Sequence, residues 1–251
     1  MLSKCCWANL ALISSIYIFL QKKQNTIVGK NKLKKFAENL TFPNLFQPTI
    51  EEARDGFKLK GNWNQGFFNN PNPIVLELGC GKGEYSIALA KKHPEKNFIG
   101  IDIKGSRLWK GAKTSQLEDL PNVAFIKSYI GFIENFFEKD EVSEIWITFP
   151  DPQPRMKQVK KRLTSPRFLD HYRNIMLAGG IIHLKTDNVE IFDFTLREVE
   201  RNKYELLYST KDLYDSDNNG EAAQVQTYYE NMFLDEGMKI NYLQFRLGTR
   251  S

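Results

Sequence analysis

The chain of 251 residues is poor in the residues that build metal sites and disulfide frameworks. It has three cysteines and three histidines, with no CxxC pair and no histidine cluster. Cys5 and Cys6 are adjacent near the start, and Cys80 lies in a glycine-rich stretch. This usage predicts neither a metal site nor disulfide bonds, and it favours a reducing, cytoplasmic setting.

A long hydrophobic run is also missing. The most apolar stretch, WANLALISSIYIFL, occupies residues 7–20. As a helix with about 1.5 Å per residue it would span roughly 21 Å, short of the ~30 Å hydrocarbon core, so we expect no stable membrane association. Residues 1–27 are interpreted as a doubtful extension, because the sequence from Val28, VGKNKLKKF, looks like a natural start and valine codons can initiate translation in bacteria.

Taken over the whole chain, positive charges exceed negative charges only slightly. The net charge is +5, but residues 1–27 hold three lysines and no acid, so the rest of the chain carries only +2. An acidic partner must therefore be argued from local clusters of charge. Residues 28–73, with closely spaced lysines and the proline-containing NLTFPNLFQPTI, predict a basic N-terminal arm. Its lysines fit a solvated helix face as well as a nucleic-acid contact.

From residue 74 onward the pattern is regular. Apolar runs predict seven strands, which lie at 74–78, 97–102, 122–126, 144–149, 181–186, 204–210 and 240–247. Amphipathic helical segments separate the early runs, and this alternation is typical of parallel βαβ units. Residues 74–251 are therefore expected to form one doubly wound, mainly parallel α/β domain with a seven-stranded sheet.

The turn after the first predicted strand, ELGCGKGEYS, has the features of a cofactor site. Gly79, Gly81 and Gly83 allow a sharp turn and leave room for a ligand at the start of the helix. Their spacing is not the GxGxxG of dinucleotide folds, and the nearby Glu77 and Glu84 would repel a pyrophosphate. Two carboxylates suit a positively charged ligand such as S-adenosylmethionine. The alternative is a tight strand–helix turn that binds no ligand.

The next predicted strand, NFIGID, ends in Asp102. A carboxylate at this position can accept hydrogen bonds from the ribose hydroxyls of an adenosine. A glycine-rich turn alone is a weak signal, but with Glu77 before it and Asp102 at the next strand end it predicts S-adenosylmethionine as the cofactor.

The segment EIWITFPDPQPRMKQVKKRL joins an apolar strand to a cluster of cations. Ligands of open parallel sheets bind beyond the carboxyl ends of the strands, where FPDP is expected to lie. Pro150 and Pro152 restrict the backbone on either side of Asp151 and so fix the position of its carboxylate. The alternative is that the prolines only end the strand and Asp151 is a solvated turn residue.

Cations follow Asp151 at once, and no acid occurs before Asp170. Such a run is often only a solvated surface. Because this one lies beside the predicted methyl donor, a phosphate backbone is the favoured partner. The candidate backbone contacts are Lys157, Lys160, Lys161 and Arg162.

In combination, VLELGCGKG, NFIGIDI, TFPDPQPRMKQVKKRL, LKTDN and QTYYE resemble the bacterial tRNA (guanine-N7-)-methyltransferases. The resemblance runs from about Gly29 to the C-terminus, and FPDP with its basic run is the most specific part. It implies a class I methyltransferase fold that uses S-adenosylmethionine and no metal. It also implies methylation of the guanine at position 46, in the variable loop of tRNA.

The resemblance further implies roles for single residues. The implied catalytic residue is Asp151. The implied cofactor-binding residues are Glu77, Gly79, Gly81, Asp102 and, as a stand-in for an acid of the family, Ser128. The implied substrate-binding residues are Arg155, Asp187, Thr227 and Glu230. The chain departs from the family where Gln153 replaces a tryptophan, Gln158 a histidine and Arg155 a lysine.

Guanine N7 has a free lone pair, so its methylation requires neither a general base nor a covalent cysteine. Positive charge develops on the purine as the methyl group transfers. A fixed carboxylate can stabilise that cation or orient the ring. Asp151 is the predicted carboxylate, with Asp187 assisting.

Alternatives remain for the whole chain and for two motifs. A methyltransferase acting on another RNA, a small molecule or a protein would share the glycine turn, and a non-catalytic RNA-binding protein could use the same scaffold. A membrane-anchored protein rests on residues 7–20 alone. TYYE also fits a helix start with aromatic side chains in the core, and TDN fits a helix cap by Asp187 or Asn188.

Overall fold

The computed structural model of the chain describes residues 31–217 and 220–248. The apolar stretch at 7–20 and the proposed start at Val28 lie outside these residues. The chain divides into two compact units, Met1–Thr41 and Phe42–Ser251, so the second unit takes in much of the predicted arm. In the first unit, residues 31–39 are helical. Within the described ranges, no helix is both long enough and apolar enough to cross a membrane.

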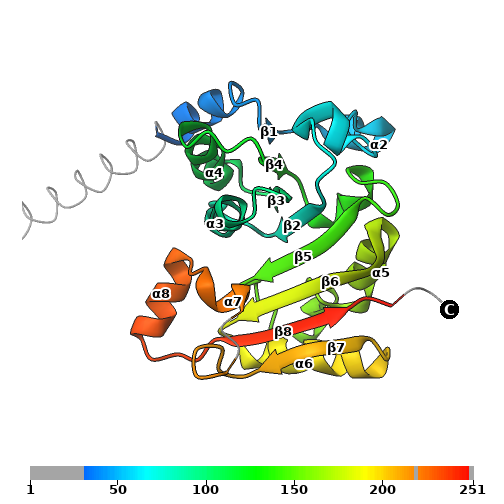
Figure 1. The fold of residues 1–251 in the computed structure, drawn as a ribbon, viewed down its shortest axis with the longest axis vertical. Coiled ribbons are helices and arrows are strands. Elements are labelled where there is room, and N and C mark those ends of the chain that lie inside the picture. The colour runs from blue at the N-terminus through cyan, green and yellow to red at the C-terminus, as the bar shows by residue number, and fades with distance from the viewer. Residues whose placement is uncertain (1–30, 218–219, 249–251) are drawn as a thin grey trace, which may run out of the picture. The chain divides into compact units, whose positions relative to one another are not determined.

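The second unit is built on one eight-stranded sheet with the order β1-β4-β3-β2-β5-β6-β8-β7 (Figure 1). The strands are β1 (Leu45–Phe46), β2 (Ile74–Leu78), β3 (Asn97–Asp102), β4 (Val123–Lys127), β5 (Val142–Thr148), β6 (Met176–Thr186), β7 (Glu205–Thr210) and β8 (Asn241–Arg246). The strands from β1 to β6 pair in parallel, and β8 is antiparallel to β6 and β7. The doubly wound, mainly parallel fold is confirmed, with one strand more than predicted.

The additional strand is β1, which pairs with β4 over two residues. Its Phe46 contacts the edge of Trp63 with ring centroids 5.2 Å apart, and Trp63 is completely buried. The indole Nε1 of Trp63 donates to the carbonyl oxygen of Phe136 at 2.9 Å. Aromatic packing therefore joins this stretch to the sheet, although a strand of two residues is too short to give a periodic sequence signal.

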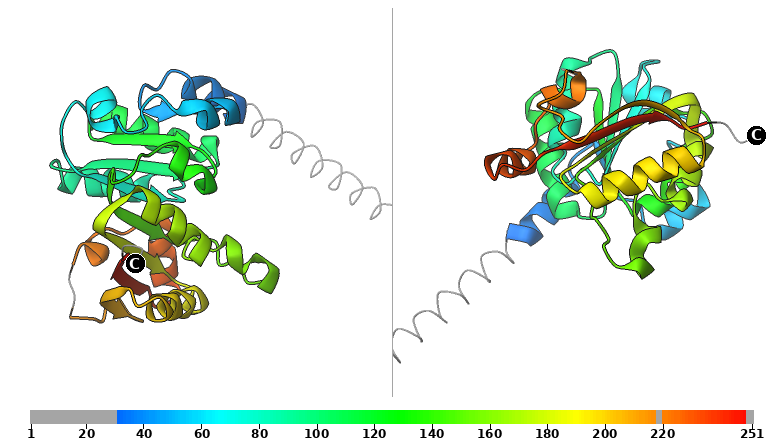
Figure 2. Two further views of the ribbon diagram at one scale, coloured as in Figure 1. Left: turned by 90° about the vertical axis from the view of Figure 1, so that its right-hand side faces the viewer. Right: turned by 90° about the horizontal axis from the view of Figure 1, so that it is seen from below.

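Helices cover both faces of the sheet (Figure 2). They are α2 (Ile50–Gly56), α3 (Glu84–Lys92), α4 (Gly105–Leu117), α5 (Pro166–Ile175), α6 (Val189–Arg201), α7 (Glu221–Gln224) and α8 (Tyr228–Asp235), with the short π- or 3₁₀-helical segments η1 (Asn64–Phe68), η2 (Ile130–Asn135) and η3 (Met156–Lys161). Along β2, Leu76 belongs to the core that includes α5 and α6 residues, whereas Val75 belongs to the core with α3 and α4 residues. Burial on both faces explains why the strand reads as a continuous apolar run.

The order of the strands defines where a ligand can bind. From the central β2, the chain builds β3 and β4 on one side and β5 and β6 on the other. The carboxyl ends of β2 and β5 therefore meet at the switch point of the sheet, where open α/β folds bind their ligands. Figure 1 shows α7 and α8 beyond this same end of β5 and β6.

Candidate active site

Two glycines in the turn after β2 are required for different reasons, one by a ligand and one by packing. Gly81 has φ +57°, its N–H donates to the Asp102 carboxylate at 3.0 Å, and an added Cβ would point into open space. Gly83 has φ +71°, and an added Cβ would lie 2.4 Å from the ring of Phe125. Glycine at 83 therefore lets α3 start close to β4, while glycine at 81 leaves room for a ligand.

Asp102 lies at the end of β3, where the sequence predicts it. One carboxylate oxygen accepts the Gly81 N–H, and the other accepts the Lys104 N–H at 2.7 Å. The side chain is buried, and these backbone bonds fix its orientation. Its remaining lone pairs stay available for hydroxyl donors of a ligand.

Glu77 is buried beneath the turn. Its Oε2 accepts the Ser86 N–H at 2.9 Å and also the Ser86 hydroxyl, and its Oε1 accepts the Thr148 hydroxyl at 3.0 Å. Burial raises the pKa of Glu77 to about 7, although the hydrogen bonds from Ser86 and Thr148 act in the opposite direction. The acid is therefore held by neutral donors and lacks a positive partner.

A cavity opens above the turn. Its walls come from the ends of β2 and β5, the start of α3, the first turn of α4 and the residues that begin α8. The lining residues are Glu77, Gly79, Cys80, Gly81, Glu84, Tyr85, Arg107, Thr148, Phe149, Thr227 and Tyr229. The structure thus brings Thr227 into the same cavity as the predicted cofactor residues of the turn.

The residues of this cavity fit S-adenosylmethionine. A ligand that carries an ammonium and a sulfonium would supply the positive charge that Glu77 lacks. Gly81 leaves space for it, and Asp102 presents fixed acceptors beside the turn. In the part of the chain that the structure describes, no group of histidine, cysteine or acidic residues could hold a metal ion.

The FPDP loop has a strained backbone on both sides of Asp151. Phe149 has φ +48° and Gln153 has φ +46°, a region that costs a non-glycine residue on the order of 1 kcal/mol or more. Two hydrogen bonds hold these residues. The Phe149 N–H donates to the Lys185 carbonyl oxygen at 2.8 Å, and the Gln153 N–H donates to the Asp151 carboxylate at 3.1 Å. The carboxylate of Asp151 is exposed at the carboxyl edge of the sheet.

The basic run after the loop contains two kinds of cation. Those that extend into solvent, with no ion pair among the described residues, are Arg155, Lys157, Lys160 and Lys161. Arg162 is buried: its Nε donates to the Pro152 carbonyl oxygen at 3.1 Å, and its guanidinium pairs with Glu190. The geometry therefore corrects the prediction for Arg162, whose guanidinium contacts the FPDP loop and has no surface to offer a phosphate.

Asp187 follows β6, the strand beside β5, so it lies at the same edge of the sheet as Asp151. It is partly exposed, and burial raises the pKa of its carboxyl. The next residue, Asn188, caps α6 by accepting the Ile191 N–H at 2.9 Å. TDN therefore contains a helix cap, which is Asn188, and this leaves the Asp187 carboxylate free of that role.

TYYE begins α8 through a capping box. The Thr227 hydroxyl accepts the Glu230 N–H, and the Glu230 carboxylate accepts the Thr227 N–H, each at 3.3 Å. Glu230 is completely buried against Lys185, which corrects its prediction as a substrate-binding residue. Tyr228 and Tyr229 are exposed, so the helix start is confirmed and the aromatic side chains do not pack in the core.

Ser128 follows β4 and is partly exposed, and its N–H donates to the carbonyl oxygen of Asp102 at 3.1 Å. It does not line the cavity. Sequence reasoning missed Arg107, Tyr229 and Lys185. Only Lys185 gave a signal, since a lysine within the apolar run IIHLKT marks a buried charge.

The chain was compared with known proteins. A family model described as "Putative methyltransferase" matches residues 71–243. The crystal structure of the 16S rRNA methyltransferase KamB superposes with a TM-score of 0.57 at 13% identity, covering 73% of this chain and 92% of that one. A 16S rRNA (adenine(1408)-N(1))-methyltransferase from Catenulisporales acidiphilia gives a TM-score of 0.51 at 13% identity, covering 75% and 91%. Fold and cavity together define a class I S-adenosylmethionine-dependent methyltransferase.

Relatives with higher sequence identity show which family within this class the chain belongs to. A tRNA (guanine-N(7)-)-methyltransferase of Christiangramia forsetii is 51% identical over 87% of this chain and 99% of the relative. The enzyme of the same name from Bacteroides thetaiotaomicron is 48% identical, covering 88% of this chain and 87% of the relative. The chain belongs to the tRNA (guanine-N(7)-)-methyltransferase family.

Proposed function

We propose that the protein transfers a methyl group from S-adenosylmethionine to N7 of a guanine in tRNA, at position 46 of the variable loop. The main support for the proposal is that the cavity, the acid and the cations follow one another closely along the chain. Phe149 lines the cofactor cavity, Asp151 follows two residues later, and exposed cations begin at Arg155. A base at the cavity would therefore have its flanking phosphates close to the basic run.

The chemistry requires orientation and a compensating charge. S-adenosylmethionine supplies an electrophilic methyl group on a sulfonium, and guanine N7 supplies the attacking lone pair. The purine becomes cationic as the new bond forms, so Asp151 stabilises the developing charge and orients the ring through its N–H groups. Asp187, which follows the neighbouring strand, assists from the same edge of the sheet.

The cofactor side is assigned to the turn and its two acids. Glu77 supplies negative charge for the cationic part of the cofactor, and Asp102 accepts hydrogen bonds from its ribose. Gly79 and Gly81 leave room for the cofactor, and Thr227 lines the same cavity. Ser128 lies beside Asp102, to whose carbonyl oxygen its N–H donates, and its hydroxyl donates to the Tyr129 carbonyl oxygen at 3.3 Å.

The RNA side is assigned to the four exposed cations. The phosphates of the tRNA are contacted by Arg155 and, on η3, by Lys157, Lys160 and Lys161. These contacts position the tRNA, and the cavity selects the base. Residues i and i+3 of a 3₁₀ helix eclipse each other, so Lys157 and Lys160 share one face. We place this activity in the cytoplasm, with tRNA as the partner.

The direct test is incubation of the purified protein with isotope-labelled S-adenosylmethionine and unmodified tRNA. Nuclease digestion and mass spectrometry then identify the labelled nucleoside. We expect 7-methylguanosine at about one methyl group per acceptor tRNA. Label on another atom or another base, or no label at all, would contradict the proposal.

A further inference from the structure

Lys185 is a charged residue inside the buried part of β6. Its Nζ donates to the carbonyl oxygens of Ala222 at 2.6 Å and Val225 at 2.8 Å, and it pairs with the Glu230 carboxylate at 2.6 Å. These partners use all three donors of the ammonium group. Each of them belongs to the segment that contains α7 and the start of α8.

Glu230 completes the cluster from the side of α8. Its Oε1 also accepts the Tyr214 hydroxyl at 2.5 Å, and its Oε2 accepts the Thr227 N–H. The side chains of Lys185 and Glu230 are both 0% exposed. Burial lowers the pKa of the Lys185 ammonium, and the Glu230 charge acts in the opposite direction. Each charge therefore depends on the other to remain buried.

The backbone of Lys185 contacts a further residue of the cavity lining, Phe149. Its carbonyl oxygen accepts the Phe149 N–H at 2.8 Å, where the strained FPDP loop begins. Phe149, Thr227 and Tyr229 all line the cavity, and the Phe149 ring also packs on Phe233 of α8 with ring centroids 5.7 Å apart. Lys185 thus binds Phe149 through its backbone, and through its side chain it binds the α7–α8 segment that carries Thr227 and Tyr229.

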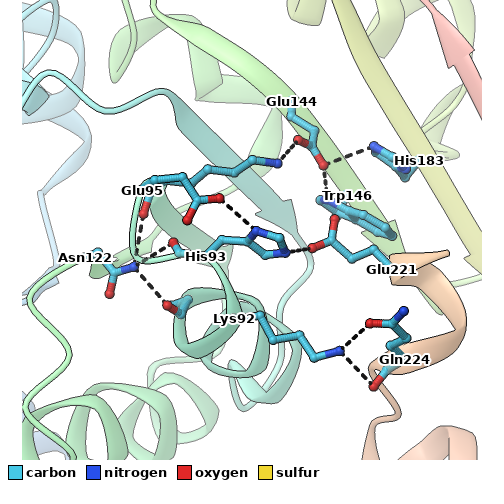
Figure 3. Close-up of polar contacts among 11 residues, drawn as sticks. Lys92, His93, Glu95, Asn122, Glu144, Trp146, His183, Glu221 and Gln224 are labelled. Carbon is cyan, nitrogen blue, oxygen red and sulfur yellow. Dashed lines mark hydrogen bonds and ion pairs between the residues drawn. The ribbon is translucent and has the colours of Figure 1, made fainter.

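The outer side of α7 has contacts of a different kind (Figure 3). At the end of α3, Lys92 Nζ donates to the Gln224 side-chain oxygen at 2.9 Å, and His93 pairs with Glu221. These side chains are partly or fully exposed, so solvent and salt weaken their attraction. The buried contacts of Lys185 are therefore the stronger constraint on this segment.

We propose that Lys185 is a positioning residue for methyl transfer, which fixes two parts of the cavity lining relative to each other: Phe149 and the segment that carries Thr227 and Tyr229. The inference rests on the proposed function because it concerns the same cavity. The Lys185 side chain is completely buried and has no surface to offer to cofactor or RNA. It acts through Phe149 on one side and through Glu230 and the α7–α8 segment on the other.

The test uses Lys185→Met, Glu230→Gln and the double variant of the full chain. Removing one partner leaves a buried, uncompensated charge, so we expect Lys185→Met to melt about 10 °C below the parent. The double variant removes both charges, and its Tm should return to within about 3 °C of the parent. The surface pair of Lys239 and Asp212, 2.9 Å apart, supplies the matched control Lys239→Met, with unchanged stability and activity.

Stability alone would not show positioning, so the double variant is examined by three further readouts. We expect kcat for tRNA methylation to fall roughly 10- to 100-fold, because small displacements of a site are costly. Without tRNA, amide exchange of residues 221–236 should accelerate at least about 10-fold, and S-adenosylmethionine should bind about 10-fold more weakly. The last two readouts decide the inference even if the parent protein does not methylate tRNA.

A double variant with restored Tm, parental kcat, parental exchange and parental cofactor affinity would overturn the inference and leave the pair a purely structural role. If the double variant does not fold, Tyr214→Phe replaces it, since this change leaves the Lys185–Glu230 pair intact and removes the hydroxyl that bonds Glu230 and Gln226. We expect faster exchange at 227–230, about 3-fold lower kcat and a nearly unchanged Tm. Unchanged exchange and kcat in that variant would equally overturn the inference.

Discussion

The proposed cofactor side, with Glu77 and Asp102, and the proposed RNA side, with Asp151 and the cations after it, are built in opposite ways. On the cofactor side, Glu77 and Asp102 are buried, and each carboxylate oxygen already accepts a hydrogen bond from the protein. On the RNA side, Asp151 is exposed with one backbone contact, and the cations from Arg155 to Lys161 have no ion pair among the described residues. The first side is buried and held by hydrogen bonds within the protein, and the second is open to solvent.

This difference follows from the ligands. A small cofactor gains affinity from a rigid, desolvated site, because little order has to be imposed when it binds. A phosphate backbone is recognised by exposed cations whose counterions are released on binding. The two sides should therefore respond differently to substitution, to pH and to salt.

The largest effect is expected for Asp151→Asn, which removes the charge at the junction of the two sides. We expect kcat to fall by about 10²–10³, because the stabilisation of the cationic purine is lost. Equilibrium binding of S-adenosylmethionine should remain within about 2-fold of the parent. Asp140→Asn, an exposed acid before β5, is the matched control and should keep full activity. Near-parental turnover of Asp151→Asn would refute the assigned role.

The next effect concerns Glu77 and the pH dependence of stability. Burial raises the pKa of Glu77 from 4.5 to about 7, so the folded protein binds this proton more tightly than the unfolded chain. The stabilisation is complete below pH 4.5 and is lost as the pH rises through 7. Between pH 5 and 8, the Tm of the ligand-free parent should fall roughly 5–10 °C more than that of Glu77→Gln. Parallel melting curves for the two proteins would show that Glu77 is not protonated in this way.

A smaller effect is expected for Lys157→Gln combined with Lys160→Gln. The tRNA Kd should rise about 10-fold, and the slope of log Kd against log salt should decrease by about 1.5–2. At saturating tRNA, kcat should be unchanged. Lys139→Gln with Lys203→Gln removes equal charge at the opposite edge of the sheet and should leave both quantities unchanged. Equal losses in the two double variants would mean that only net charge attracts the RNA.

The smallest effect is expected for Arg162→Gln. This variant tests whether a cation of the basic run holds the FPDP loop in place or contacts phosphate. Because Arg162 contacts the Pro152 carbonyl oxygen and Glu190, its loss should loosen the FPDP loop and lower kcat roughly 3- to 10-fold. The salt slope of tRNA binding should stay at the parental value. A reduced slope would restore Arg162 to the phosphate contacts.

The sequence predicts the parts of the site whose signals are local. The glycine turn, Asp102 at a strand end and the two prolines around Asp151 each act within a few residues. Their positions in the structure agree with the prediction. The parallel strands were recognisable because burial on both faces makes them continuous apolar runs.

Other features depend on partners far away in the chain. Glu230 looks like a ligand-binding acid until β6 places Lys185 beside it, 45 positions earlier in the numbering. Arg162 looks like one more surface cation until the fold brings Glu190 and the Pro152 carbonyl oxygen to it. Strand β1 gave no periodic signal because it has only two residues. Contacts of this kind follow from the tertiary fold, and no local pattern encodes them.

The central claim is that this site methylates N7 of one guanine in tRNA. Its most direct measurement compares two transcripts of the same tRNA, one with guanine and one with adenine at position 46, under labelled S-adenosylmethionine. We predict about one labelled methyl group per guanine-46 transcript, recovered as 7-methylguanosine, and none on the adenine-46 transcript. Equal labelling of both transcripts would contradict the claim.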